Sequence, residues 1–130
     1  MVLDCSTNRG FVGPAYRDAA FPEAVSKCKP GFPSRPGGSP SRPLLVPSSS
    51  RTTAEERHKG AYGYQYCGQG GLSWSIPYCT GVLALGWQLR PDLSAAKMKE
   101  ILLESAYVDD QGLRFIDPPR FVEMVRALPA

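Results

Sequence analysis

The longest apolar run of the chain, residues 73–88, predicts a helix. Pro77 lies near its beginning, where a first helical turn tolerates a missing N–H, and no other proline interrupts the run. From residue 82 onward, Gln88 is the only clearly polar residue, and it stands at the far end. A helix that is apolar nearly all round belongs inside a layered domain rather than on its surface, so we expect this helix to be buried.

Two further helices are predicted in the last third of the chain. The first spans residues 94–107, and a polar, turn-rich break at residues 108–112 follows it. Pro118 and Pro119 then open the last helix, because its first turn tolerates proline. The apolar positions 121, 122, 124 and 125 of this helix share one face, which is suited to docking on a sheet.

The first half of the chain is less regular. Residues 1–16 have the pattern of a short buried strand that runs into a polar, glycine-containing turn. The chain holds 13 glycines and 13 prolines among 130 residues, which is above average usage and predicts much turn or irregular structure. Many of them lie in residues 29–51, which we predict to be a loop with a short strand at residues 44–47.

The segment between this loop and the long helix carries two local patterns. Residues 53–56, TAEE, have the form of a capping box and predict one turn of helix. Tyr62, Tyr64 and Tyr66 alternate with smaller or polar residues, which is the period of a half-exposed strand. A tyrosine row could bind a ligand, but such a row more often packs against a helix, and we expect packing.

Composition and charge exclude several classes of function. The net charge is +3 and the 15 basic residues are scattered, so we predict neither a nucleic-acid partner nor a membrane surface. No export signal and no membrane-spanning run of apolar residues is visible in the sequence, which makes the cytoplasm the default location. The four cysteines never form a Cys-x-x-Cys pair and there is one histidine, so we expect free thiols, no metal site and no cofactor.

Ser73 is the candidate nucleophile. Gly70 and Gly71 allow a backbone turn, and Ser73 follows them at the start of the predicted helix. The unpaired N–H groups and the positive dipole end of a helix favour a developing negative charge, which suits acyl transfer. The same residue types also describe a serine that merely caps the helix, so both interpretations remain open at this point.

The segment 71–81, GLSWSIPYCTG, resembles the active-serine motif of the subtilisin-like serine proteases, Gly-Thr-Ser-x-Ala/Ser-x-Pro-x-x-Ala-Gly. The similarity continues through an apolar helix, a turn at residues 91–94 and a leucine-rich stretch at residues 101–106. Leu72 and Thr80 stand where the family usually has threonine and alanine. The resemblance implies that Ser73 is a catalytic nucleophile. It also implies an α/β, three-layer fold with a mostly parallel sheet, of which residues 1–130 form the C-terminal part.

The resemblance also assigns a role to Asn8. Residues 6–10, STNRG, look like the family's small-residue turn, whose asparagine amide completes the oxyanion hole. The separation of 65 residues between Asn8 and Ser73 is similar to that in the family. Asparagine is also a common plain turn residue.

The family's aspartate and histidine motifs are absent. Asp4, His58 and Ser73 occur in the family's order. However, His58 lies between Arg57 and Lys59, only 15 residues before the serine and outside any His-Gly-Thr motif. We therefore expect Asp4 and His58 to be structural or surface residues.

Two hypotheses of function follow. The first is the C-terminal part of a subtilisin-like serine endopeptidase, which acts on a polypeptide substrate and is inactive until a missing N-terminal half supplies the aspartate and histidine, because an unactivated serine attacks poorly. Such a partial fold would expose apolar surface. The second is a non-catalytic pseudoprotease or protein-interaction module.

Overall fold

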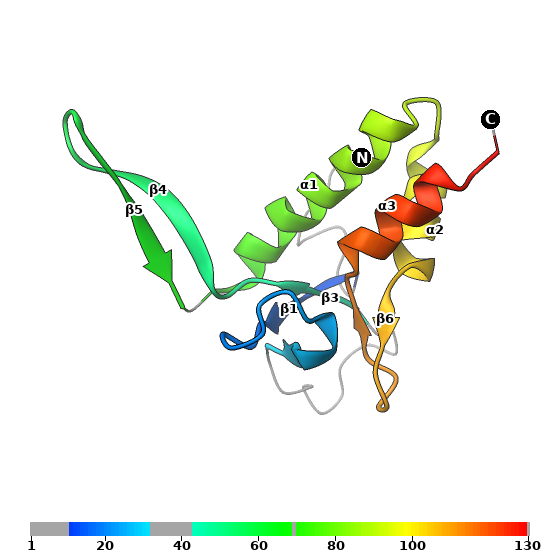
Figure 1. Cartoon of the computed structure of the whole chain (residues 1–130), viewed down its shortest axis with the longest axis horizontal. Coiled ribbons are helices and arrows are strands. Elements are labelled where there is room, and N and C mark those ends of the chain that lie inside the picture. The colour runs from blue at the N-terminus through cyan, green and yellow to red at the C-terminus, as the bar shows by residue number, and fades with distance from the viewer. Residues whose placement is uncertain (1–10, 32–42, 69, 130) are drawn as a thin grey trace.

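The computed structural model describes residues 11–31, 43–68 and 70–129 (Figure 1). In chain order the elements are β1 (Val12–Tyr16), a short 3-10 helix η1 (Val25–Lys27), β2 (Lys29–Pro30), β3 (Leu44–Pro47), β4 (Arg51–His58), β5 (Ala61–Cys67), α1 (Leu72–Leu89), α2 (Ala95–Glu104), β6 (Tyr107–Val108), β7 (Arg114–Phe115) and α3 (Pro118–Arg126). Asn8 and Asp4 lie outside the described residues, so their predicted roles remain predictions.

The main sheet contains five strands in the order β2-β1-β3-β7-β6. Its centre is parallel, because β3 pairs in parallel with β1 on one side and β7 on the other. The two edge strands are antiparallel to their neighbours, so the sheet is mixed and the expected parallel arrangement holds only for its centre. The strand predicted at residues 44–47 is confirmed as β3, the middle strand of the sheet.

β1 occupies a segment that was expected to be turn or loop. Gly13 and Pro14, a pair typical of turns, lie in this strand and are buried. A Cβ on Gly13 would lie 3.1 Å from Cδ2 of Leu45, so the missing side chain lets β3 approach closely. The carbonyl of Pro14 accepts a hydrogen bond from Gly31 N at 2.8 Å, which connects the strand to the segment after β2.

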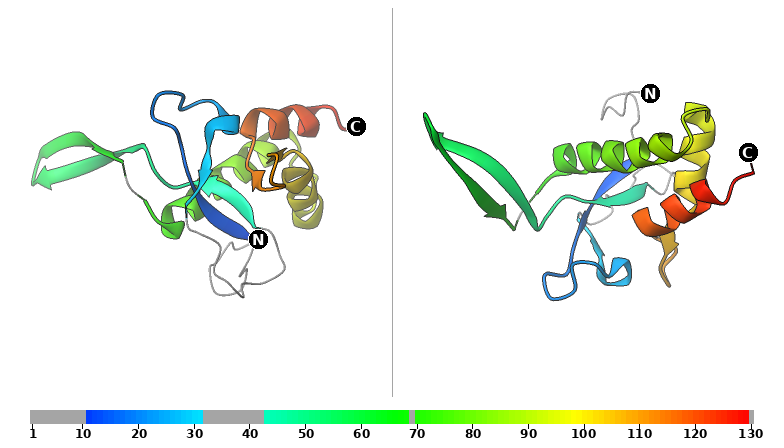
Figure 2. Two further views of the ribbon diagram at one scale, coloured as in Figure 1. Left: turned by 90° about the horizontal axis from the view of Figure 1, so that it is seen from below. Right: turned by 45° about the horizontal axis from the view of Figure 1, so that its top comes forward.

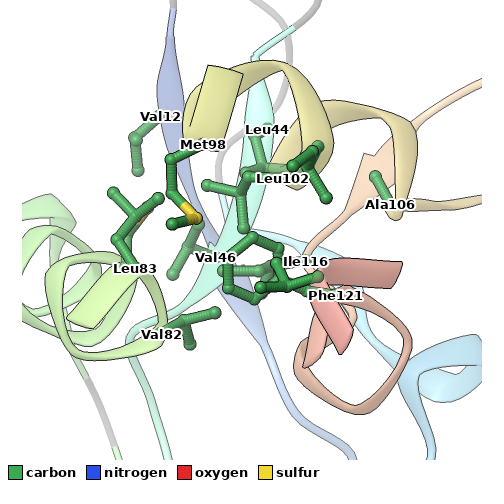
Figure 3. Packing of buried hydrophobic residues seen from close by; sticks show 13 residues of the cluster. Val12, Leu44, Val46, Val82, Leu83, Met98, Leu102, Ala106, Ile116 and Phe121 are labelled. Atoms are coloured by element: carbon green, nitrogen blue, oxygen red, sulfur yellow. The ribbon is translucent and has the colours of Figure 1, made fainter. Parts of the chain in front are cut away.

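The core lies between the sheet and the three helices. Val12, Leu44 and Val46 belong to the cluster that includes residues of α1, α2 and α3 (Figure 3). Leu45 and Phe115 belong to a smaller cluster with Ala15. Because neighbouring strand residues point to opposite faces, all three helices cover one face of the sheet. The smaller cluster is covered by residues from η1, its C-terminal flank and the β6–β7 region.

α1 is half covered, so the expectation that it is buried inside the domain is wrong for the described residues. One face, which includes Cys79, Val82 and Leu83, is buried against the sheet and the other helices. The other side is open, and Trp74 and Leu85 are 43% and 45% exposed. The uniformly apolar sequence of α1 therefore gives it an apolar face in contact with solvent.

The two C-terminal helices form close to their predicted positions. α2 is shorter than residues 94–107, and Ser94 is its N-cap, accepting a hydrogen bond from Lys97 N at 3.2 Å. α3 begins at Pro118 as predicted, and the side chain of Asp117 caps it by accepting from Arg120 N at 3.2 Å.

Strands β4 and β5 form a separate two-stranded hairpin that projects from the body (Figures 1 and 2). The helical turn predicted at residues 53–56 is wrong, because these residues are part of β4. The predicted tyrosine strand is confirmed as β5, but its predicted packing is wrong. Tyr62, Tyr64 and Tyr66 are 79%, 77% and 61% exposed.

Candidate functional site

Ser73 is the second residue of α1, and its side chain is exposed. The N-cap of the helix is Gly71, so Ser73 does not cap the helix. No hydrogen bond joins its hydroxyl group to another residue in the described part of the chain. The hydroxyl is therefore accessible to a ligand that approaches the start of α1.

The backbone around Ser73 also has unused hydrogen-bonding groups. The amides of Leu72 and Ser73 lie in the first turn, where N–H groups have no acceptor within the helix, and this end carries the positive end of the helix dipole. Pro77 is the sixth residue of α1 and lies past the first turn in which it was expected. Because proline has no N–H, it cannot donate to the carbonyl of Ser73, four residues earlier.

Ser75, two residues further along, has a different role. It is fully buried, and its Oγ donates a hydrogen bond of 2.8 Å to the carbonyl of Val46 in β3. This bond fixes the first turns of α1 over the middle strand of the sheet. Ser75 is therefore structural, whereas Ser73 is exposed to solvent.

The approach of the chain to α1 depends on Gly70. A Cβ at this position would overlap the carbonyl of Ser48, which follows β3, and would lie 2.9 Å from Nη1 of Arg51. Gly71 has no such neighbour within 4 Å. Gly70 thus allows the start of α1 to lie directly beside the carboxyl end of β3.

The only histidine of the chain lies far from Ser73. His58 is at the tip of the projecting hairpin, where it is paired with Ala61 and is exposed (Figure 1). Six residues of extended strand separate it from Arg51 at the base of the hairpin, so the Cα atoms of His58 and Arg51 are about 20 Å apart. Ser73 lies in the first turn of α1, and the hairpin extends away from the start of that helix (Figure 1), so the structure does not bring His58 to the serine. The predicted surface position of His58 is confirmed.

A cleft of about 450 Å³ opens beside the start of α1, at the carboxyl ends of β1 and β3. Its lining residues are Tyr16, Arg17, Ser49, Ser50, Gly68 and Gly70. Ser50 has a φ of 52°, which is uncommon for a residue other than glycine. Crevices at the carboxyl ends of parallel strands are frequent ligand sites.

Two arginines stack on aromatic residues of α1 near this cleft. The guanidinium of Arg17 lies 5.2 Å from the ring centre of Tyr78, and its Nη2 donates to the Tyr78 hydroxyl at 3.0 Å. The guanidinium of Arg51 lies 3.8 Å from the ring centre of Trp74 and donates to the carbonyl of Ser48. Neither arginine–aromatic pair could be predicted from the sequence, because the two residues of each pair are far apart in the chain and belong to no motif.

Within the described residues, no group of three His, Cys, Asp or Glu side chains could hold a metal ion. None of the helices that the structure describes has the length and apolar character needed to cross a membrane. Cys28, Cys67 and Cys79 are free thiols. Burial raises the pKa of Cys28 while the positive charge of Arg17 partly opposes that shift.

Burial raises the pKa of Cys79, in the core, from 9.0 to about 11. Below pH 9 the thiol is protonated in both the folded and unfolded states. Between pH 9 and about 11 the unfolded chain loses this proton while the folded chain keeps it, so the stability of the protein should fall in this window. The loss should be on the order of 2 kcal/mol.

The measurement is urea unfolding of the wild type and of Cys79→Ala across this pH range. The stability difference between the two proteins should change as the pH rises, and a constant difference would contradict the prediction. Alkylation of the folded protein gives an independent check. The partly exposed Cys28 and Cys67 should react before the buried Cys79.

A scan of the sequence against protein-family models and a search of curated proteins find no match.

Proposed function

We propose that this chain is the C-terminal part of a subtilisin-like serine endopeptidase, with Ser73 as its nucleophile. The observation that carries the proposal is the position of Ser73. It is an exposed serine in the first turn of a helix that begins beside the carboxyl ends of parallel strands. The finer fold assignment, a subtilisin-like three-layer domain, belongs to the same proposal.

The local chemistry supports acyl transfer. In this mechanism Ser73 Oγ attacks the carbonyl carbon of a peptide bond and forms an acyl-enzyme as the amine leaves. The oxyanion that develops would accept a hydrogen bond from the backbone N–H of Ser73, which has no acceptor within α1. We propose the side-chain amide of Asn8 as the second donor.

The general base must come from another segment. The proton of Ser73 needs an acceptor within hydrogen-bond reach, and His58 is at the hairpin tip, about 20 Å from Arg51 at the hairpin base. The open side of α1 includes Ser73, Thr80 and Ala84, which are exposed. We propose that a missing N-terminal half covers this side and supplies the histidine and aspartate, so that the isolated chain hydrolyses no peptide.

The experiment is to treat the folded chain with a fluorophosphonate probe, with free imidazole added as a substitute base. Mass spectrometry should find the adduct on Ser73, and imidazole should increase its rate of formation. Ser73→Ala should abolish the adduct without changing stability, because the side chain is exposed. Ser75→Ala should keep the adduct but lower the free energy of unfolding by about 1–2 kcal/mol, because a buried hydrogen bond is lost.

Ser94 is a matched internal control, because it is another exposed serine at the start of a helix. Equal labelling of Ser73 and Ser94, or no adduct on Ser73 in the folded protein, would overturn the proposal. Either result would favour the pseudoprotease or interaction module. Labelling of Ser73 that is equally fast with and without imidazole would show that the chain, alone or in an assembly, supplies its own base.

A further inference from the structure

The cleft beside α1 contains a preorganised cationic group. Two contacts orient the Arg17 side chain, namely the hydrogen bond of 3.0 Å to the Tyr78 hydroxyl and the stacking of the guanidinium on the same ring. The backbone N–H of Arg17 donates to Ser49 Oγ at 3.2 Å, which fixes the residue at the end of β1. A guanidinium held in this way loses little conformational entropy when it binds an anion.

No acidic side chain is paired with Arg17 among residues 11–31, 43–68 and 70–129. The ion pairs found there join Arg90 to Asp92 and Lys97 to Glu100. Tyr78 uses one N–H of the guanidinium, which has five. The remaining donors can take a carboxylate, the group whose planar geometry matches a guanidinium fork.

The surroundings add to the positive potential of the cleft. The guanidinium of Arg51 is held over Trp74, one helical turn before Tyr78, and lies close to Gly70 in the cleft wall. The positive end of the α1 dipole is at the same place. A negatively charged ligand group is therefore favoured over a neutral group of the same shape.

The cleft is also close enough to Ser73 to receive part of the same substrate. Gly70 lines the cleft and is three residues before Ser73, so their Cα atoms are at most about 11 Å apart. An extended peptide advances about 3.3 Å per residue. A peptide with its scissile carbonyl at Ser73 would thus reach the cleft with a side chain about three residues from the cleaved bond.

We infer that this cleft is a subsite for an acidic side chain, Asp or Glu, of a polypeptide substrate, and that Arg17 binds its carboxylate. The inference rests on the proposed function in one respect, because only a protease would treat the bound peptide as a substrate. It adds a substrate class that the serine motif does not specify. Tyr78 is a positioning residue in this site, because it acts through Arg17.

The test measures peptide binding, which requires no general base. The probes are a series of Gly-Ser peptides that are labelled with fluorescein and amidated at the C-terminus. Each peptide carries a single Glu, whose position differs from one peptide to the next. A control peptide with Gln at the same position accompanies each one. Fluorescence anisotropy with the full chain should show at least one Glu peptide that binds about tenfold more tightly than its Gln counterpart. Added salt should reduce this preference.

Variants of the protein distinguish binding by Arg17 from a general effect of positive charge on the affinity for Glu peptides. Arg17→Gln should remove the preference for Glu, and Arg120→Gln, which changes an exposed arginine on α3, should keep it. Tyr78→Phe retains the stacked ring and loses only the hydroxyl, so it should reduce the preference about threefold and provides a second test if Arg17→Gln does not fold. A Glu preference that survives Arg17→Gln would overturn the inference.

The remaining outcomes distinguish this inference from the proposed function. Equal binding of Glu and Gln peptides, with an adduct on Ser73, would overturn the subsite and leave the proposed nucleophile intact. A Glu preference that depends on Arg17, with Ser73 unreactive, would support the carboxylate site and count against proteolysis. Tighter binding of a Gln peptide with a free C-terminal carboxylate than of the amidated Glu peptides would assign the site to a chain terminus and overturn the inference.

Discussion

Gly70→Ala is expected to lower the free energy of unfolding by about 3 kcal/mol or more, because the added methyl group would overlap a backbone atom. The obstructing group is the carbonyl of Ser48, at the end of the middle strand of the sheet. A carbonyl in that position cannot move aside as the end of a flexible side chain could. The start of α1 would have to separate from β3, which would also strain the hydrogen bond between Ser75 and Val46.

Gly71→Ser is the matched control for this prediction. Gly71 is the N-cap, its φ of −128° is extended backbone open to any residue, and a Cβ there would meet nothing within 4 Å. Serine is a better N-cap than glycine, so this change should stabilise the protein by a few tenths of a kcal/mol. Urea unfolding of the two variants provides the comparison, and similar stabilities would show that α1 does not approach β3 as closely as described.

Gly86→Ala is expected to cost about 2 kcal/mol through overpacking where α1 meets α2 and α3. A Cβ on Gly86 would lie 2.6 Å from Sδ of Met98 and 2.7 Å from Cζ of Phe121. Both side chains are fully buried, so neither can swing into solvent (Figure 3). The helices would have to move apart to make room for the methyl group.

Gly81→Ala tests the open side of the same helix. Gly81 is exposed, and a Cβ there has no neighbour within 4 Å. Alanine has the higher helix propensity, so this variant should gain about 0.5–1 kcal/mol. The same denaturation experiment measures both variants. A loss at residue 81 would mean that this side of α1 is already covered in the isolated chain.

The sequence predicted those elements whose local pattern and tertiary role agree. The middle strand at residues 44–47 and the helix that begins at Pro118 are of this kind. The sequence-based prediction was wrong where contacts between distant segments override a local sequence pattern. Residues 53–56 fit a capping box, yet they form a strand because residues 62–65 pair with them. Gly13 and Pro14 are typical of a turn, yet they lie in a buried strand because Leu45 packs closely on the glycine.

The candidate site could be predicted only in part. The apolar run of residues 73–88 placed Ser73 at the start of a helix, which the structure confirms. It could not show which side of that helix is covered, because a helix that is apolar all round has no preferred face. The site of Arg17 could not be predicted either, since Tyr78 is 61 residues away and the contact exists only once β1 and α1 are in place.

The projecting hairpin also bears on how the chain can tolerate changes in length. Its turn includes Gly60, with a φ of 81°, and lies at the end of the hairpin away from the sheet and the three helices (Figure 2). Residues inserted there would lengthen a surface loop without disturbing the core, and each doubling of loop length costs only about 0.6 kcal/mol of closure entropy. Residues can therefore be inserted between β4 and β5 at little cost in stability, while the spacing from Gly70 to Ser75 is held by contacts with β3 and the segment after it.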